Sequence, residues 1–284
     1  MSSPRPVLPH LLEERIRLAA TAVNYDLTSL ADRRRAGADL ARFFLTLQAA
    51  LRPSVVAEVG AYSAAFSQEV RTQTPDARVV AFEANPYNHA QFSSEHSYEQ
   101  LGIEYLQRAV SDRNGTTEFL LHRSVQKRPI PQVAGNHSLL RRSEPGVKYE
   151  KATVQTVRLD TFFADDLKRD ASFTLWVDVE GATRKAFAGA QGVLAKTLSV
   201  MIEVEEHAFW KNQWLFHDVH QHLGERGFRA LARDFEQPFQ FNVVFVHESR
   251  LNDARVMDAI VNHYSTVAGA RPKTTARRVS AAPR

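Results

Sequence analysis

The sequence has 284 residues, of which 44% are hydrophobic and 24% are charged, and its formal net charge is +4. These proportions are ordinary for a globular protein with room for one α/β domain plus additions, or for two small domains. The chain contains no cysteine, which excludes disulfides, thiolate metal sites and a cysteine nucleophile.

The positive charge lies at the C-terminal end. The last fifteen residues hold five basic side chains and no acidic one, whereas residues 1–269 hold 31 basic and 32 acidic residues. We expect a disordered tail there, and the absence of interleaved aromatic residues argues against nucleic-acid binding.

No apolar run approaches the ~20 residues that span a bilayer. The first residues, Met-Ser-Ser-Pro-Arg-Pro, also lack the apolar stretch of a signal peptide. We therefore expect no membrane span and a cytoplasmic protein.

Apolar residues recur at near-helical spacing over residues 8–25 and 29–51. Ser29 with Asp32 resembles a capping box in which Asp replaces the usual Glu. We expect residues 1–52 to form an N-terminal helical extension that covers a sheet. The alternatives are a cap over a ligand and a contact between copies in a homo-oligomer.

Residues 54–86 indicate a strand, a tight loop, a helix and a second strand. The first apolar run contains Glu58 and is followed at once by Gly60, and the second ends on Glu83. In such a βαβ unit a nucleoside lies across the carboxyl ends of the strands, and an acid after the second strand accepts hydrogen bonds from the ribose. Glu83 is placed for that role.

The loop after the first strand argues against some ligands. It lacks the Gly-x-Gly-x-x-Gly of dinucleotide sites, and the chain has no Gly-Lys-Ser/Thr phosphate loop, so dinucleotides and triphosphates are disfavoured. Glu58-x-Gly60 with Glu83 instead looks like the S-adenosylmethionine site of a class I methyltransferase. We expect the cofactor to lie against Glu58, Gly60, Tyr62, Ser63, Glu83 and Ala84. Any α/β protein, however, can have a glycine and solvated acids at these positions.

The next segment contains a helix over residues 86–100 and a third strand over 103–110, whose end would flank the adenine through Ala109 and Ser111. We expect strands over residues 116–121 and 154–159. Residues 122–151 are polar and rich in Pro and Gly, which predicts a long loop that is functional or disordered. Three cations in this loop, Arg141, Arg142 and Lys148, either meet an anionic or sugar substrate or are solvated.

A specific resemblance begins at the strand over residues 173–179. Asp178-Val-Glu-Gly-Ala182, followed by Ala188-Gly-Ala190, resembles the signature of the FkbM family of S-adenosylmethionine-dependent methyltransferases. Glu58-Val-Gly-Ala61, Phe82-Glu-Ala-Asn-Pro86, Ala109-Val-Ser111 and Arg158-Leu-Asp160 occur upstream in the family's order, so the match covers roughly residues 55–246. The chain departs from the family at Tyr62 and Ala64, where Asn and Gly are common.

The resemblance implies a class I methyltransferase fold. This is an α/β, Rossmann-like fold with a seven-stranded mixed sheet ordered 3-2-1-4-5-7-6 and helices on both faces. We place the methyltransferase domain at residues 53–250, with closing strands at 228–232 and 239–247. Residues 251–284 would contain a last helix over 253–265 and the basic tail.

Methyl transfer to a hydroxyl needs the acceptor oxygen held ~3 Å from the methyl carbon and a way to remove its proton. Asp178 ends one strand, and Glu205, Glu206 and His207 end its neighbour. We hypothesise that Asp178 with Glu205 or Glu206 binds Mg²⁺, an arrangement similar to that of macrolide-sugar O-methyltransferases.

The proton would then pass to His207 or to His137. Under the competing interpretation, the strand-end acids cap helices or pair with arginine, and His207 packs at the rim of the site.

Residues 207–217 contain four aromatic side chains that suit a sugar ring or a macrolide, or else belong to the core: Phe209, Trp210, Trp214 and Phe216. The resulting prediction is an O-methyltransferase for a hydroxyl of a sugar, glycan or glycosylated natural product, and hence polysaccharide or natural-product biosynthesis. One alternative is metal-free methylation of a polyketide hydroxyl, a carboxylate or an amine. The other is a non-catalytic nucleoside-binding or interaction protein.

Overall fold

The structure is a computed structural model that describes residues 9–269. The tail expected to be disordered beyond Val267 lies almost wholly outside the described residues. Within them, no helix is both long enough and apolar enough to cross a membrane.

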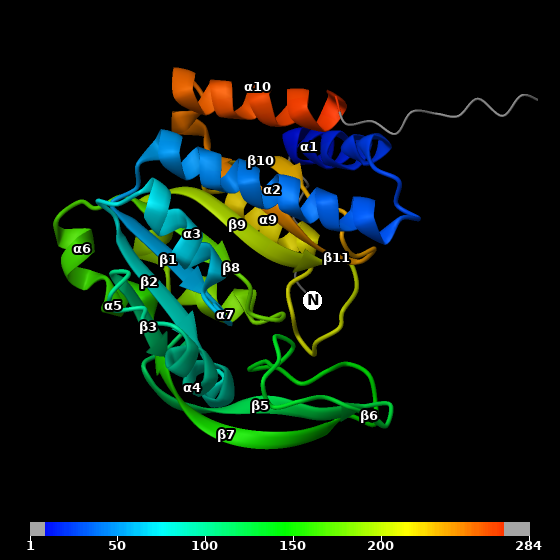
Figure 1. The fold of residues 1–284 in the computed structure, drawn as a ribbon, viewed down its shortest axis with the longest axis vertical. Helices are drawn as coiled ribbons and strands as arrows, with labels where there is room; N and C mark the ends of the chain where they lie inside the picture. The colour runs from blue at the N-terminus through cyan, green and yellow to red at the C-terminus, as the bar shows by residue number, and fades with distance from the viewer. Residues whose placement is uncertain (1–8, 270–284) are drawn as a thin grey trace, which may run out of the picture.

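The core of the protein is a seven-stranded sheet (Figure 1) in the order β3-β2-β1-β8-β9-β11-β10. Its strands are β1 (Val55–Val59), β2 (Arg78–Glu83), β3 (Ile103–Gln107), β8 (Phe173–Val177), β9 (Thr197–Glu205), β10 (Phe228–Arg233) and β11 (Gln240–His247). β3, β2, β1, β8 and β9 run parallel, while β11 is antiparallel to both of its neighbours. The predicted order 3-2-1-4-5-7-6 and the predicted fold class are confirmed.

Strand alternation divides the apolar residues between two layers of helices. In β1, Val55, Ala57 and Val59 face one hydrophobic cluster and Val56 faces the other. The first cluster includes residues of α1 (Pro9–Ala20), α5 (Leu159–Phe162), α7 (Thr183–Ala188), α8 (Gln191–Ala195) and α9 (Phe216–Gly224). The second includes residues of α2 (Leu30–Leu51), α3 (Ala65–Gln73), α4 (Pro86–Glu95) and α10 (Ala254–Gly269). The remaining helical pieces are η1 (Thr21–Asn24), α6 (Ala164–Lys168) and η2 (Glu248–Arg250).

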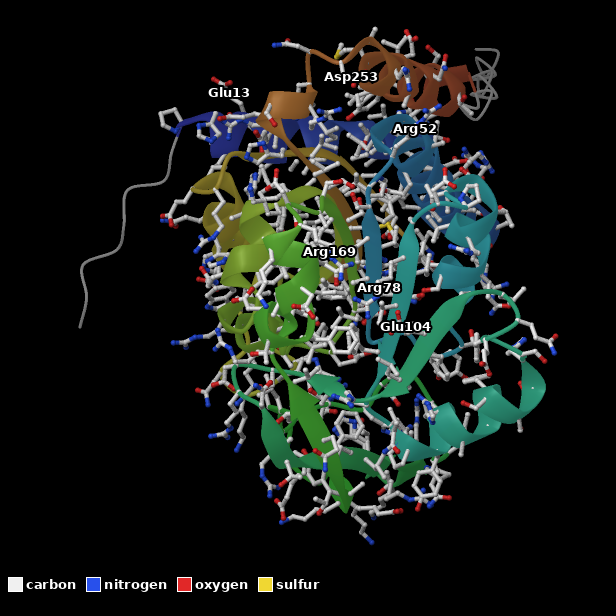
Figure 2. The ribbon with its side chains drawn as sticks, turned by 90° about the vertical axis from the view of Figure 1, so that its left-hand side faces the viewer. Glu13, Arg52, Arg78, Glu104, Arg169 and Asp253 are labelled. Atoms are coloured by element: carbon white, nitrogen blue, oxygen red, sulfur yellow. The ribbon has the colours of Figure 1, made fainter. Side chains whose placement is uncertain are left out.

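The outer surface of the parallel strands carries an ion pair between neighbours. Arg78 on β2 and Glu104 on β3 lie 2.7 Å apart (Figure 2). Both side chains are about 40% exposed, so the pair contributes little stability and offers a convenient control position.

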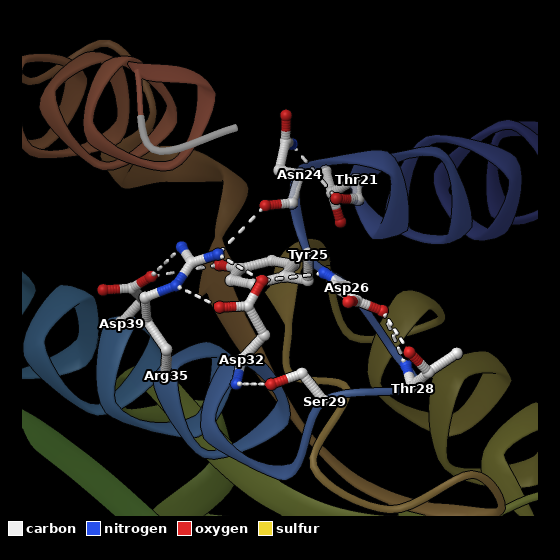
Figure 3. Close-up of polar contacts among 9 residues, drawn as sticks. All are labelled: Thr21, Asn24, Tyr25, Asp26, Thr28, Ser29, Asp32, Arg35 and Asp39. Atoms are coloured by element: carbon white, nitrogen blue, oxygen red, sulfur yellow. Dashed lines mark hydrogen bonds and ion pairs between the residues drawn. The ribbon is translucent and has the colours of Figure 1, made fainter. Parts of the chain in front are cut away.

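The two N-terminal helices pack as structural cover. α2 lies over the sheet beneath α10 (Figure 1), and its Phe44 and Leu47 are fully buried. Ser29 caps α2 by accepting a hydrogen bond from the Asp32 N–H at 3.3 Å. The capping box is incomplete, because the Asp32 carboxylate accepts from the Asp26 N–H and from Arg35 instead of from the Ser29 N–H (Figure 3).

The expectation of a long loop over residues 122–151 holds for residues 130–147, which form no regular helix or strand, and is wrong at both ends of the segment. A second sheet, in the order β4-β7-β5-β6, is formed by β4 (Ala109–Val110), β5 (Gly115–Val125), β6 (Arg128–Pro129) and β7 (Lys148–Val157). Alternate residues of β5 and β7, including Phe119, Leu121 and Val154, form a small hydrophobic cluster on one face. The residues on the other face are polar, so these strands lack the continuous apolar run that identifies a buried strand in the sequence. Because β4 follows β3 after one residue, this small sheet lies beyond the carboxyl ends of the main strands (Figure 1).

Candidate functional site

A pocket opens at the carboxyl ends of β1, β2 and β8. Its walls include Gly60, Glu83 and Asp178 from the main sheet and Phe119 from the small sheet. Open α/β sheets bind ligands at this edge. None of the described residues of α1 or α2 lines the pocket, so these helices cover the sheet and not the ligand site.

Glu83 holds the turn that forms one wall of the pocket. Its two carboxylate oxygens accept hydrogen bonds from the Tyr62 and Asn85 N–H groups, both at 2.7 Å. Burial raises the pKa of Glu83 to about 7, although the two N–H groups favour its charged form. The side chain is therefore fixed in position and lies in the lining, where hydroxyl groups of a ligand can reach it.

The turn after β1 requires Gly60 for two reasons. Its φ is +86°, and a Cβ atom there would lie 1.6 Å from the Asp178 carbonyl oxygen. The glycine is thus needed for the close approach of β1 and β8, whether or not a ligand is bound. Tyr62 and Ala64 also have positive φ values, 47° and 50°, so the backbone keeps a glycine-like path with residues that adopt it less readily.

Five of the eight predicted cofactor residues line the pocket: Gly60, Tyr62, Glu83, Ala84 and Ala109. The other three, Glu58, Ser63 and Ser111, are not part of its lining. Glu58 Oε2 accepts hydrogen bonds from the Ser67 N–H at 2.9 Å and from the Ser67 hydroxyl at 2.6 Å, and burial raises its pKa to about 8. Its contact is with the start of α3, so its role in the structure is to support the loop.

A strap over residues 132–139 closes the pocket opposite the main sheet. The Asn88 side chain donates to the Ala134 carbonyl at 3.0 Å and accepts from the Ala134 N–H at 3.1 Å. The Asn85 side chain donates to the Gln132 carbonyl at 2.7 Å. Neither asparagine was predicted as a site residue. Asn85 carried two signals, its place in the motif Phe82-Glu-Ala-Asn-Pro86 and its position before Pro86, which marks a helix start.

His137 lines the pocket within the strap, but both of its ring nitrogens are engaged. Nδ1 accepts from the His122 N–H at 3.1 Å, and Nε2 lies 3.0 Å from the Gln132 carbonyl, to which it donates. Burial lowers its pKa, which keeps the ring neutral. This geometry favours a structural role for His137 over the predicted role of proton acceptor.

Four acidic side chains gather where β8 and β9 end. Oxygens of Asp178, Glu180 and Glu203 lie within 4.8 Å of one another. Glu205 is 2% exposed, and its Oε1 has no hydrogen-bond partner among residues 9–269. Burial raises the pKa of Asp178 to about 6, and burial with the charge of Asp178 raises that of Glu205 to about 8. Burial and mutual repulsion raise the pKa values of Glu180 and Glu203 well above their ordinary range.

This acidic cluster differs from the predicted metal ligands. Glu206 lies outside it and pairs with Arg15 at 3.5 Å, because successive residues of a strand point to opposite sides. The same alternation puts Glu203 beside Glu205. Glu180 joins the cluster through a sharp turn after β8, where its φ is 49° and that of Gly181 is 79°.

His207 and the aromatic residues lie apart from the pocket lining. His207 is exposed and packs edge-on against Phe239 at 4.2 Å between ring centroids. Trp210 and Phe216 are 0% and 2% exposed, so these two belong to the core and offer no face to a sugar. Phe209 and Trp214 are half-buried.

A family model described as the methyltransferase FkbM domain matches residues 54–230. No curated protein matches this chain.

Among solved structures, methyltransferase FkbM from Methylobacillus flagellatus aligns at 11% identity and a TM-score of 0.43, over 68% of this chain and 44% of that chain. This chain thus spans less than half the length of that protein. The 1,6-didemethyltoxoflavin-N1-methyltransferase of Burkholderia thailandensis aligns at 13% identity and a TM-score of 0.36, over 86% of this chain and 93% of that one. An O-methyltransferase from Bacillus cereus aligns at 11% identity and a TM-score of 0.35, over 85% and 92% of the two chains.

Proposed function

The chain belongs to the FkbM methyltransferase family, and from that premise we propose that it methylates a hydroxyl of a sugar, glycan or glycosylated natural product, using S-adenosylmethionine. The observation that carries the proposal is the pocket at the carboxyl ends of β1, β2 and β8, which brings Glu83 and Asp178 into one lining.

The residues of the pocket fit the cofactor. Glu83 would accept hydrogen bonds from the ribose hydroxyls, and the turn from Gly60 to Tyr62 would face the methionine end. Ala84 and Ala109 supply small side chains where a flat base can lie. When bound, S-adenosylmethionine supplies a methyl group on a positively charged sulfur, and the carboxylates nearby favour that charge.

The acidic cluster fits a divalent cation. Asp178, Glu180 and Glu203 offer oxygens close enough to share one ion, and the unpartnered Oε1 of the buried Glu205 adds a further acceptor. Hard oxygen ligands of this kind suit Mg²⁺. When bound, the ion would relieve the repulsion among the carboxylates and lower the pKa of an acceptor hydroxyl.

Carboxylates are also better placed than histidines to accept the proton of the acceptor. Asp178 and Glu180 line the pocket, whereas His137 has both nitrogens occupied and His207 lies outside the lining. We propose that one of these two carboxylates orients the hydroxyl and takes its proton as the new C–O bond forms.

The test is methyl transfer from S-adenosylmethionine with a labelled methyl group to a panel of sugars and glycosylated natural products, with and without EDTA. We expect label on an acceptor oxygen, a rate lowered by EDTA, and a loss of about 100-fold or more in Asp178→Asn. The control is Asp112→Asn, whose carboxylate accepts a hydrogen bond from the Ser111 hydroxyl outside the pocket lining. Full activity in EDTA and in Asp178→Asn would contradict a role for the metal. If the protein binds the cofactor but labels none of the acceptors, a sugar hydroxyl is not its methylation site.

A further inference from the structure

Two glutamine side chains donate hydrogen bonds to the acidic cluster, and the proposed reaction gives neither of them a role. Gln213 Nε2 donates to Glu205 Oε2 at 3.2 Å. Gln240 Nε2 donates to Glu203 Oε1 at 2.8 Å. Each of the two cluster acids on β9 is therefore held by one amide donor.

The strand register places Gln240 beside the cluster. Glu203 and Glu205 are two residues apart on β9, so their side chains point to the same face of the sheet. In the antiparallel pairing of β9 with β11, Gln240 lies opposite Glu205, and its side chain reaches diagonally to Glu203. The backbone of Gln240 is thus placed by the strand ladder itself.

Gln213 lies in the segment between β9 and α9, and its amide is oriented by the neighbouring Trp210. The side-chain oxygen of Gln213 accepts a hydrogen bond from the Trp210 N–H, which turns the NH₂ group towards Glu205. Trp210 is fully buried, and a Cβ atom added to Gly181 would lie 2.4 Å from its Cδ1 atom. The Arg142 guanidinium covers the indole ring at 4.6 Å from its centre. The chain around Gln213 therefore fixes the direction in which its amide donates.

The hydrogen bond from Gln213 occupies one oxygen of Glu205 and leaves the other free. Glu205 is 2% exposed, and its Oε1 has no hydrogen-bond partner among residues 9–269. The negative charges of Asp178 and Glu180 act on the same carboxylate. A buried carboxylate oxygen that lacks a donor and lies near further carboxylates is a suitable ligand for a cation.

Both donors are neutral, so they orient the carboxylates without cancelling their charge. An amide N–H donates a hydrogen bond but carries no ionic charge, whereas a lysine or arginine in the same place would compete with a metal ion. The charge of Arg142 does reach Glu180 and Glu205, but its guanidinium makes an ion pair with Glu144, at 3.3 Å. The cluster thus keeps its attraction for a cation.

We propose that Gln213 and Gln240 are positioning residues for the Mg²⁺ site, each holding one carboxylate of β9 in the orientation that places an oxygen in the acidic cluster. This inference rests on the proposed metal-assisted methyl transfer and names the residues that act through its ligands. Removal of a donor that orients a metal ligand typically lowers metal affinity about 10- to 100-fold.

The first test is binding of Mg²⁺ to the full chain, measured by calorimetry. Gln213→Met and Gln240→Met keep the length of the side chain and remove its N–H donor. We expect each variant to bind Mg²⁺ about tenfold or more weakly than the parent protein. Neither glutamine lines the pocket, so the affinity for S-adenosylhomocysteine should stay unchanged.

The matched control is Gln91→Met, since Gln91 Nε2 donates to Glu95 Oε1 at 2.9 Å on the exposed surface of α4. We expect less than a twofold change in Mg²⁺ affinity in this control. A loss in the control as large as in the two variants would overturn the proposal, as would Mg²⁺ affinity equal to that of the parent in both Gln213→Met and Gln240→Met.

The second test is a double-mutant cycle, which separates positioning of Glu205 from a general effect on the fold. Glu205→Gln removes the charged group through which Gln213 acts, so adding Gln213→Met to it should change Mg²⁺ affinity less than twofold. The same loss from Gln213→Met in both backgrounds would overturn its role. Melting temperatures without metal establish that each variant is folded, and Gln240→Met decides the question if Gln213→Met is not.

The parent protein separates failure of this inference from failure of the proposed function. If it binds no Mg²⁺ at millimolar concentration, the positioning role and the metal site are both refuted, while label on an acceptor would leave the methyl transfer standing. If it binds Mg²⁺ and both glutamine variants bind as tightly, only the positioning role is refuted.

Discussion

At the scale of single residues, Glu83 joins structure to function most directly. Its carboxylate accepts hydrogen bonds from two backbone N–H groups and also faces the pocket. In Glu83→Gln one acceptor oxygen becomes an NH₂ group that points at an N–H donor. We expect the affinity for S-adenosylhomocysteine, measured by calorimetry, to fall about tenfold to 100-fold.

Glu104→Gln is the control for Glu83, because Glu104 lies on the next strand and pairs only with Arg78 at the surface (Figure 2). The assignment of Glu83 would be wrong if both variants bound S-adenosylhomocysteine as tightly as the parent protein.

Glu58 makes the stability of the protein depend on pH. Burial raises its pKa in the folded state to about 8, above the ordinary 4.5 of a glutamate, so the folded state keeps a proton that the unfolded state loses. Stability therefore decreases as the pH rises between these two values.

Glu58→Gln removes this titration and keeps an oxygen for Ser67, so its melting temperature relative to the parent should increase from about pH 5 to pH 8. Glu69→Gln changes an exposed acid on α3, the helix that contains Ser67. The pH dependence of its melting temperature should be the same as that of the parent protein. If the melting temperatures of Glu58→Gln and of the parent protein change with pH in the same way, Glu58 is not buried and protonated in the folded state.

At the scale of elements, the turn between β1 and α3 depends on Gly60. A Cβ atom there would overlap the Asp178 carbonyl, and the φ of +86° adds backbone strain. We expect Gly60→Ala to lose about 3 kcal/mol or more of unfolding free energy in urea.

Gly135 also lines the pocket, but a Cβ atom added there meets nothing within 4 Å. Gly135→Ala should therefore change the unfolding free energy by no more than about 1 kcal/mol. If Gly60→Ala is as stable as Gly135→Ala, the approach of β1 and β8 at Gly60 leaves room for a Cβ atom.

Because residues of the strap over 132–139 line the pocket, we predict that the strap limits access to it. Asn88 holds it through two hydrogen bonds to Ala134, each contributing about 1 kcal/mol. In Asn88→Ala we expect S-adenosylhomocysteine to dissociate about tenfold faster in stopped-flow experiments.

Asn114 also bridges two segments, since its side chain contacts Thr161 and the Arg158 N–H outside the pocket lining. Asn114→Ala should leave the dissociation rate unchanged. An equally fast release from both variants, or from neither, would remove the strap as a gate.

Elements with strong local signals could be predicted, and those that depend on distant partners could not. The buried runs of β1, β2 and β8 carry their own signal, as does the acid at the end of β2. Parts of β5 and β7 were predicted as strands over residues 116–121 and 154–159, but their pairing into a second sheet was missed. The reason is that β7 starts with Lys148, Tyr149 and Glu150, a polar sequence whose pairing with β5 becomes visible only in the fold. The place of Glu203 in the acidic cluster could have been found, since it alternates with Glu205 along β9.

At the scale of the whole molecule, the sheet order follows from the family resemblance, while the distribution of charge emerges from the structure. Of the four acids at the ends of β8 and β9, Asp178 and Glu205 were predicted as neighbours, strand alternation could have added Glu203, and Glu180 joins them only through the turn after β8.

The measurement that tests the account most directly is thermal unfolding with S-adenosylmethionine, S-adenosylhomocysteine or NAD, each with Mg²⁺ and with EDTA. A ligand at 100 times its dissociation constant stabilises the folded state by about 2.7 kcal/mol, which raises the melting temperature by about 5 °C or more. We predict this rise with both adenosyl ligands and none with NAD. No shift with either adenosyl ligand at millimolar concentration, or an equal shift with NAD, would contradict the methyltransferase assignment of the pocket.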